Sequence, residues 1–232
     1  LAQIQQEKAD PVGLALRVFP GLLYGPGHAY ANPWTGSGTE ESTGKITRDD
    51  VIRFHRTWFK PNHATLVVVG ATTMTEIKPK LERLFAGWKP GDVPVKNIAT
   101  VEQQPRPVVY LIDRPGSLQS LIIAGNIAPP KANPNEVSIQ TMNGVLGSDF
   151  SSRVNMNLRE DKHWAYGAYT FFRDARGQRP FVAYAPVQTD KTKESIVELD
   201  KELRGIVRER AGPKLGRSLP SQKKRSSTDS SG

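Results

Sequence analysis

Arg159 and Tyr166 are the two residues whose types and spacing best suit chemistry on a substrate. They stand seven positions apart in the segment from Asn157 to Gly167. An arginine presents a fixed fork of N–H donors that can hold a carbonyl or carboxylate, and a tyrosine hydroxyl can donate to an oxyanion forming on a scissile carbonyl. Such a pair could bind a substrate and stabilise charge, but it could not by itself cleave a bond.

The segment from Ser151 to Gly167 has to position this pair. Val154 and Leu158 are four residues apart, and the chain from Trp164 onward is rich in aromatic residues. This pattern predicts a helix that runs into a strand, with Arg159 at the end of the helix and Tyr166 on the strand. The alternative is structural: an arginine there commonly complements the helix dipole, and a strand tyrosine commonly packs with its hydroxyl at the surface. Spacing alone does not separate the two interpretations.

The first part of the chain has the pattern of an α/β layer. A helix is predicted after the N-cap Thr47, because apolar residues follow at helical spacing until Pro61. The β-branched run from Ala64 to Gly70 predicts a buried strand, and a second helix is predicted from about Thr75 to Ala86. Between about Lys89 and Pro107 the chain has four prolines and no periodicity, so we expect residues 93–106 to form a linker.

The remainder alternates between strand and helix patterns, with a Pro-Gly turn at Pro115. The predicted elements are strands at Val108–Asp113 and Gln119–Gly125 lying side by side, a helix at Asn135–Leu146, a hairpin of Trp164–Phe172 with Phe181–Val187, and a helix from Asp190 to about Arg208.

Composition excludes several classes of protein. The chain has 232 residues, 37% of them hydrophobic, which suits one or two globular domains. Six of its nine excess positive charges fall in residues 203–232, and we expect residues 211–232 to form a disordered basic, serine-rich tail. Because no nucleic-acid-binding motif accompanies this tail, no nucleic-acid partner is expected. There is no cysteine. We expect no transmembrane segment and no signal peptide within this sequence, and the absence of an initiator Met suggests a fragment of a longer polypeptide.

The four histidines, His28, His55, His63 and His163, do not form a zinc motif. No pair has the spacing His-x-x-Glu-His or His-x-x-x-His, whereas a zinc site needs at least three converging protein ligands. A Gly-x-Ser-x-Gly nucleophile motif is also absent. We therefore expect neither a catalytic metal nor a cofactor site within this chain.

Several segments, read in order, resemble the pitrilysin and insulinase family of zinc metallopeptidases. They include Tyr24–Tyr30 and Leu66–Gly70 in the first part, and Gly147–Glu160 followed by Tyr166-Gly167 in the second. The resemblance covers about residues 1–207. It implies an α+β fold with two partial metallopeptidase-like domains, each a mainly antiparallel sheet covered by helices. Residues 1–92 would be the second half of a degenerate, non-metal domain, residues 93–106 a linker, and residues 107–210 a partial substrate-binding domain.

The resemblance also implies a function. The family's His-x-x-Glu-His motif normally lies upstream, and Gln3 stands where the third zinc ligand, a glutamate, is expected. The intact protein would carry zinc outside this chain, in an N-terminal half that belongs to the same polypeptide or to a partner subunit. Arg159 and Tyr166 would then bind a peptide or unfolded protein substrate and stabilise the oxyanion. The alternative is an inactive scaffold or peptide-binding subunit. No residue decides the compartment, and a periplasmic or cell-envelope location is the favoured expectation.

Overall fold

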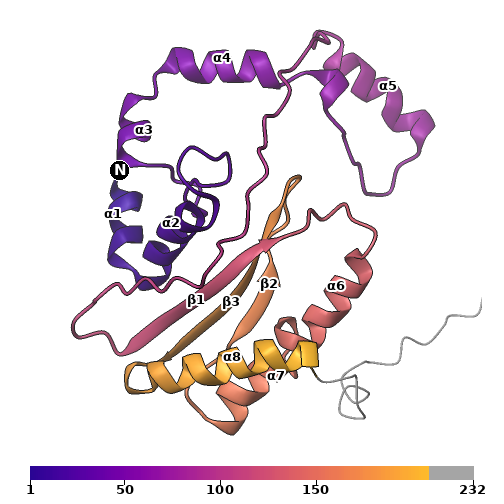
Figure 1. Ribbon diagram of the computed structural model, residues 1–232. Coiled ribbons are helices and arrows are strands. Elements are labelled where there is room, and N and C mark those ends of the chain that lie inside the picture. Colours follow the sequence, from indigo (N-terminus) through magenta and orange to yellow (C-terminus); the bar gives the residue numbers. More distant parts are fainter. Residues whose placement is uncertain (209–232) are drawn as a thin grey trace, which may run out of the picture.

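The computed structural model describes residues 1–208 and begins with two packed helices. Helix α1 (Ala2–Ala9) leads through a single residue into α2 (Pro11–Tyr24). The two helices are held together by an ion pair between Glu7 Oε2 and Arg17 Nη1 at 2.7 Å, and both side chains are largely buried. This helix pair lies beside the sheet (Figure 1).

The following helices extend away from the sheet. They are α3 (Glu40–Lys45), α4 (Arg48–Trp58), the short 3₁₀ helix η1 (Pro61–His63) and α5 (Met74–Phe85). Thr47 caps α4 by accepting a hydrogen bond from the third backbone N–H of the helix, as the sequence predicts. Both helices predicted in this part are confirmed, and they follow one another along the top of the molecule in Figure 1.

Two strands predicted from the sequence are not formed. Residues 64–70 and 108–113 run without helix or strand structure, so the prediction that the second run pairs with its neighbour was wrong. The turn after it is present, because Ser117 N donates to Arg114 O at 3.2 Å and Gly116 adopts a φ of 79°. The physical reason is that β-branched composition favours a strand only where a partner offers backbone groups and a surface to pack on.

The sheet is antiparallel and has three strands in the order β1-β3-β2. Strand β1 (Gln119–Ala128) pairs along its whole length with β3 (Arg179–Gln188), which also pairs with β2 (Tyr169–Phe172). The predicted hairpin is therefore confirmed, with a shorter first strand. Antiparallel strands combined with helices confirm the α+β fold class.

Helices lie on both faces of this sheet (Figure 1). On one face, Ala183, Ala185 and Val187 of β3 are buried in the main apolar core. On the other, a Cβ added to Gly125 of β1 would point toward the Phe19 ring of α2 at 3.1 Å. Alternation of side chains along β1 and β3 thus creates two packed surfaces.

The helices on the core face come from the second half of the chain. These are α6 (Glu136–Asn143), the π-helix η2 (Gly144–Ser148), α7 (Arg153–Asn155), the π-helix η3 (Met156–Asp161) and α8 (Thr192–Arg208), which follows the 3₁₀ turn η4 (Thr189–Lys191). They contribute buried Leu146, Val154, Leu158 and Leu199 to the core. The helix predicted at Asn135–Leu146 is confirmed, and it is formed by α6 and the π-helix η2 that follows it.

A buried arginine fastens α6 to the hairpin. Arg179 is fully buried, and its Nη1 donates to Glu136 Oε1 at 3.0 Å and to Asp174 Oδ1 at 2.9 Å. Its guanidinium also lies over the Phe172 ring, 4.8 Å from the centroid. Hydrogen bonds from Arg179, followed by one from Gln140, lower the pKa of the Glu136 carboxyl. This network closes one end of the sheet.

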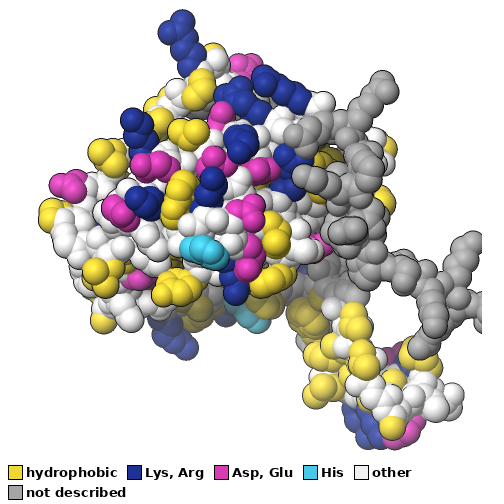
Figure 2. Space-filling view, turned by 90° about the horizontal axis from the view of Figure 1, so that it is seen from below, with side chains coloured by type: hydrophobic (Ala, Val, Ile, Leu, Met, Phe, Trp, Pro, Cys, Tyr) yellow, Lys and Arg dark blue, Asp and Glu magenta, His cyan; other side chains and the backbone are white. Residues whose placement is uncertain are grey.

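The surface seen from below carries both signs of charge. Lys, Arg, Asp and Glu side chains are interspersed there with apolar ones (Figure 2). Within residues 1–208, no helix has both the length and the apolar character that a membrane crossing requires. The expected basic tail, residues 211–232, lies outside the described residues.

Candidate functional site

Arg159 lies on η3 and is supported by an aromatic ring. Its guanidinium carbon is 4.5 Å from the centroid of the Phe150 ring, which is itself 60% exposed. Stacking uses the flat face of the guanidinium and leaves its N–H groups available in the plane. Arg159 Nε also lies 3.3 Å from Glu160 Oε1, in an ion pair that is open to solvent. The side chain is therefore oriented by the ring and remains accessible.

Tyr166 lies in a bend rather than on a strand. Strand β2 begins only at Tyr169, and before it Ala165 makes an isolated bridge with Val187. The predicted strand is interrupted because Ala168 N donates to the side chain of Asn155, at 3.1 Å, and not to β3. Tyr166 is 87% exposed, and its hydroxyl makes no hydrogen bond within residues 1–208.

Asn155 connects the two segments that carry these groups. It is fully buried on α7, and its Nδ2 donates to Phe150 O at 2.7 Å while its Oδ1 accepts from Ala168 N at 3.1 Å. One side chain thus fixes the loop beneath Arg159 and the bend that presents Tyr166. The sequence analysis missed this residue. The sequence offered no clear signal for it, because the residues at helical spacing from Asn155 are mostly polar.

Two carboxylates of α8 hold the helices that carry Asn155 and Arg159. Asn157 Nδ2 donates to Glu198 Oε2 and to Glu202 Oε1, both at 2.8 Å, and Arg153 Nε donates to Glu202 Oε2 at 2.8 Å. Hydrogen bonds from Asn157 and then Lys201 lower the pKa of the Glu198 carboxyl. The long C-terminal helix therefore serves as a support for the site.

The backbones of η2 and β2 approach each other closely at Gly147 and Thr170. Thr170 Oγ1 donates to Asn143 Oδ1 at 2.7 Å, and Asn143 Nδ2 donates back to Thr170 O at 3.2 Å. A Cβ at Gly147 would come within 2.2 Å of Thr170 Oγ1. Only glycine lets η2 pack this tightly on β2. No hydrogen bond joins Arg159 to Tyr166 in the described part of the chain; Asn155 is the side chain that links their two segments.

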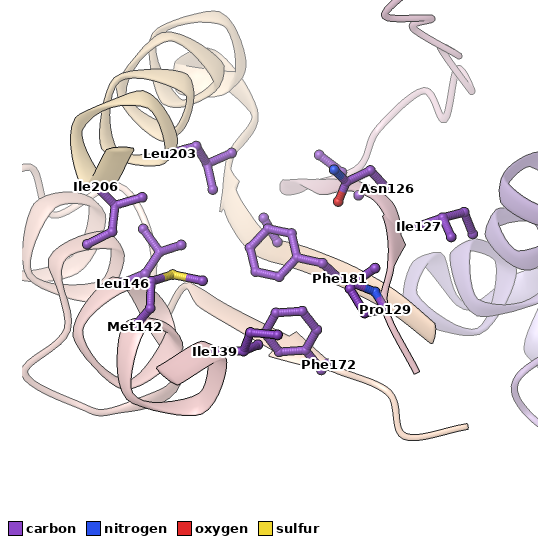
Figure 3. Close-up of a pocket in the computed structure, with 14 residues that line it drawn as sticks. Asn126, Ile127, Pro129, Ile139, Met142, Leu146, Phe172, Phe181, Leu203 and Ile206 are labelled. Carbon is purple, nitrogen blue, oxygen red and sulfur yellow. The ribbon is translucent and has the colours of Figure 1, made fainter. Parts of the chain in front are cut away.

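An apolar hollow of about 560 Å³ lies elsewhere, between the sheet, α6 and the end of α8 (Figure 3). Its larger lining side chains are Met142, Leu146, Phe172, Phe181, Leu203 and Ile206. The lining includes no ionisable side chain and neither Arg159 nor Tyr166. The hollow can therefore hold apolar groups but offers no acid, base or nucleophile.

None of the four histidines is buried, and three of them, His28, His55 and His163, make local contacts. The ring of His28 stacks on Tyr24, with centroids 4.9 Å apart, and its Nδ1 accepts from Tyr30 N at 3.0 Å. His163 Nδ1 lies 3.1 Å from Arg159 O. Gln3, at the position expected for a third ligand, instead donates to Glu7 Oε1 at 3.1 Å. Among residues 1–208 no three His, Cys, Asp or Glu side chains cluster as a metal site, so this donor set does not fit zinc.

Known proteins similar to this chain share one family. The model described as "Peptidase M16 inactive domain" matches residues 45–214. An uncharacterized zinc protease of Streptomyces coelicolor is 25% identical over 178 residues, which cover 74% of this chain and 38% of that protein.

Solved structures agree in fold. A peptidase M16 inactive domain from Pseudomonas fluorescens matches with a TM-score of 0.82 and 19% identity, over 93% of this chain and 51% of that one. A protease from Helicobacter pylori matches with a TM-score of 0.66 and 20% identity, over 88% of this chain and 54% of that one. This chain therefore spans about half the length of these solved relatives.

Proposed function

Because this chain belongs to the peptidase M16 family and matches its inactive domain, we propose that it is the non-zinc half of a zinc-dependent metalloendopeptidase. In this role Arg159 binds the peptide, and Tyr166 donates a hydrogen bond to the oxyanion that develops on the scissile carbonyl. Hydrolysis takes place at a zinc site outside this chain. The substrate is a peptide or an unfolded protein.

The exposure of Tyr166 carries this proposal. The tyrosine is 87% exposed although Ala168, two residues later, is fully buried. A tyrosine with a packing role buries its ring, whereas this ring is presented to the outside from a fixed backbone. Arg159 supports the same view, because its described side-chain partners are the Phe150 ring and the Glu160 carboxylate and not the carbonyls at the end of its helix.

The donor set and the chain length support pairing with a zinc-bearing half. The described residues hold no cluster that could bind zinc. The two solved relatives have about as much chain again beyond the part that this chain matches. The additional half, in the same polypeptide or in a partner subunit, would hold the metal.

Replacing Tyr166 with phenylalanine tests the oxyanion role. In the intact protein, Tyr166→Phe should lower kcat by about tenfold to a thousandfold, the scale for losing one oxyanion donor. Tyr169→Phe is the matched control, since Tyr169 lies on the same segment and is 41% exposed. Turnover by Tyr166→Phe equal to that of the control would exclude this role.

An inactive scaffold or peptide-binding subunit is the second candidate, favoured by the missing metal cluster within residues 1–208. Adding a chelator distinguishes the peptidase candidate from the scaffold candidate. If the intact protein is a peptidase, chelation abolishes hydrolysis of an unfolded protein; a scaffold binds that protein without cleaving it. Hydrolysis by this chain alone that persists in chelator would contradict both candidates.

A further inference from the structure

His163 has an unusual backbone conformation between the two candidate residues. It follows Arg159 by four positions and precedes Tyr166 by three. Its φ of 57° lies in the left-handed region, and among residues 1–208 every other residue with a positive φ is a glycine. A side chain in this region is strained, so the surrounding structure must hold it there. Because glycine would adopt the same backbone without strain, the turn by itself does not require a histidine.

The backbone of His163 reverses the chain at the end of η3. The next amide, Trp164 N, donates back to Leu158 O at 3.0 Å. A residue with positive φ followed by such a backward hydrogen bond is a common way to end a helix. The chain therefore passes from η3 to the bend of Tyr166 through one turn that is centred on His163.

The imidazole ring of His163 binds this turn to the end of the helix. Its Nδ1 lies 3.1 Å from Arg159 O. A carbonyl oxygen can only accept, so Nδ1 has to carry the proton that this hydrogen bond needs. Carbonyls in the last turn of a helix lack a partner within the helix, and the ring supplies one. The contact is made at the residue from which the candidate arginine side chain extends.

Gln188, the last residue of β3, holds the other side of the turn. Its Nε2 donates to His163 O at 3.0 Å, and its backbone N donates to Trp164 O at 2.9 Å. Immediately afterwards, Ala165 forms its isolated bridge with Val187 of the same strand. The segment after η3 is thus attached to the sheet at consecutive residues.

We propose that His163 is a positioning residue that sets how the Arg159 and Tyr166 side chains lie relative to each other. It acts through its hydrogen bond to Arg159 O and through the turn that Gln188 holds on the sheet. Asn155 joins the same two segments from the buried side, and His163 joins them from the exposed side. The inference rests on the proposed function, because the relative position of the two side chains matters only if both act on one peptide.

Two substitutions at His163 separate the ring from the backbone. Glycine adopts the left-handed conformation without strain but has no donor, whereas asparagine also tolerates this conformation and carries an N–H donor on Cγ, the atom to which Nδ1 is bonded in histidine. In the intact protein, with fluorescently labelled casein as the unfolded substrate, His163→Gly should lower kcat/KM by about tenfold to a hundredfold, the scale for misplaced groups at an active site. His163→Asn should retain most of the activity.

Thermal unfolding and a matched control exclude a purely structural effect. His163 is exposed, and relief of backbone strain offsets the lost hydrogen bond, so the Tm of His163→Gly should stay close to that of the unaltered protein. His63→Gly makes the same change at another exposed histidine and should keep full kcat/KM. Full kcat/KM in His163→Gly, or an equal loss in His163→Asn, would overturn the positioning role.

The protonation site of the ring gives a readout that needs neither zinc nor catalysis. Isotope-edited NMR of the histidine rings in the 232-residue chain, at a pH where the ring is neutral, should find the His163 proton on Nδ1. The signal is assigned by its loss in His163→Asn. A proton on Nε2 would overturn the proposal, because the hydrogen bond to Arg159 O could then not form.

Kinetics of the variants distinguish failure of this inference from failure of the proposed function. If Tyr166→Phe lowers kcat while His163→Gly retains full kcat/KM, the positioning role alone is refuted. If Tyr166→Phe retains full kcat while His163→Gly loses kcat/KM and His163→Asn restores it, the oxyanion role alone is refuted.

Discussion

Replacing Asn155 with leucine should weaken both the fold and the candidate site. The side chain is fully buried, so water cannot replace the hydrogen bonds it makes to Phe150 O at 2.7 Å and Ala168 N at 3.1 Å. Leaving a buried polar group unpaired costs about 1–3 kcal/mol, which for two groups gives about 2–6 kcal/mol. The similar size of leucine and its favourable burial offset part of this cost. We expect a net loss of about 3 kcal/mol.

Thermal unfolding followed by circular dichroism measures this loss. For a chain of this size, about 3 kcal/mol corresponds to a fall in Tm of about 6–12 °C. Asn97→Leu is the matched control, because it makes the same chemical change at an exposed position and should leave Tm nearly unchanged. In the intact protein, Asn155→Leu should also lower kcat, since Phe150 and Tyr166 lose their common anchor. A Tm within about 1 °C of the control would refute the reasoning.

Two further predictions concern buried ion pairs. Arg179→Met should destabilise the fold by about 2 kcal/mol, which is less than the loss of about 3–5 kcal/mol for a fully buried pair because the Glu136 and Asp174 carboxylates remain partly hydrated. Arg176→Met, at an exposed position of the same hairpin, should not destabilise it; equal urea midpoints for the two variants would contradict this. The pKa of Glu7 is lowered from 4.5 to about 2, first by the hydrogen bond from Ser37 and then by Arg17, while burial opposes the shift. A lowered folded-state pKa gives stability that is present above pH 4.5 and is lost as the pH falls toward 2. Glu7→Gln should therefore lower Tm at pH 7, and the difference in Tm between the variant and the unaltered protein should vanish near pH 2. A difference in Tm that stays constant from pH 7 to pH 2 would be inconsistent with the lowered pKa of Glu7.

Local patterns in the sequence predicted helices α4, α5, α6 and α8, whereas α1, α2 and α3 were not predicted. Thr47 and the apolar spacing that follows it specify α4, and the stripe that includes Leu199 and Leu203 specifies α8. These predictions succeed because capping and helical periodicity depend on residues only a few positions apart. The β2–β3 hairpin was predictable for a similar reason, since its two strands are close in sequence.

The predictions that failed were those that needed a distant partner. Residues 64–70 and 108–113 have strand composition, but no described segment pairs with them. The bend at Tyr166 exists because Ala168 N donates to Asn155, thirteen residues earlier. Neither outcome can be derived from spacing, because hydrogen bonds between distant segments depend on how the chain packs.

The sequence by itself singled out Arg159 and Tyr166 as candidate residues for binding and oxyanion stabilisation, and their roles stay predictions. Only the tertiary structure decided how they are presented, with Arg159 over the Phe150 ring and Tyr166 on an exposed bend. It also revealed Asn155 as the residue that joins the two segments. The physical reason is that side-chain type sets which hydrogen bonds are possible, whereas burial and long-range packing set which of them are made and which groups remain accessible.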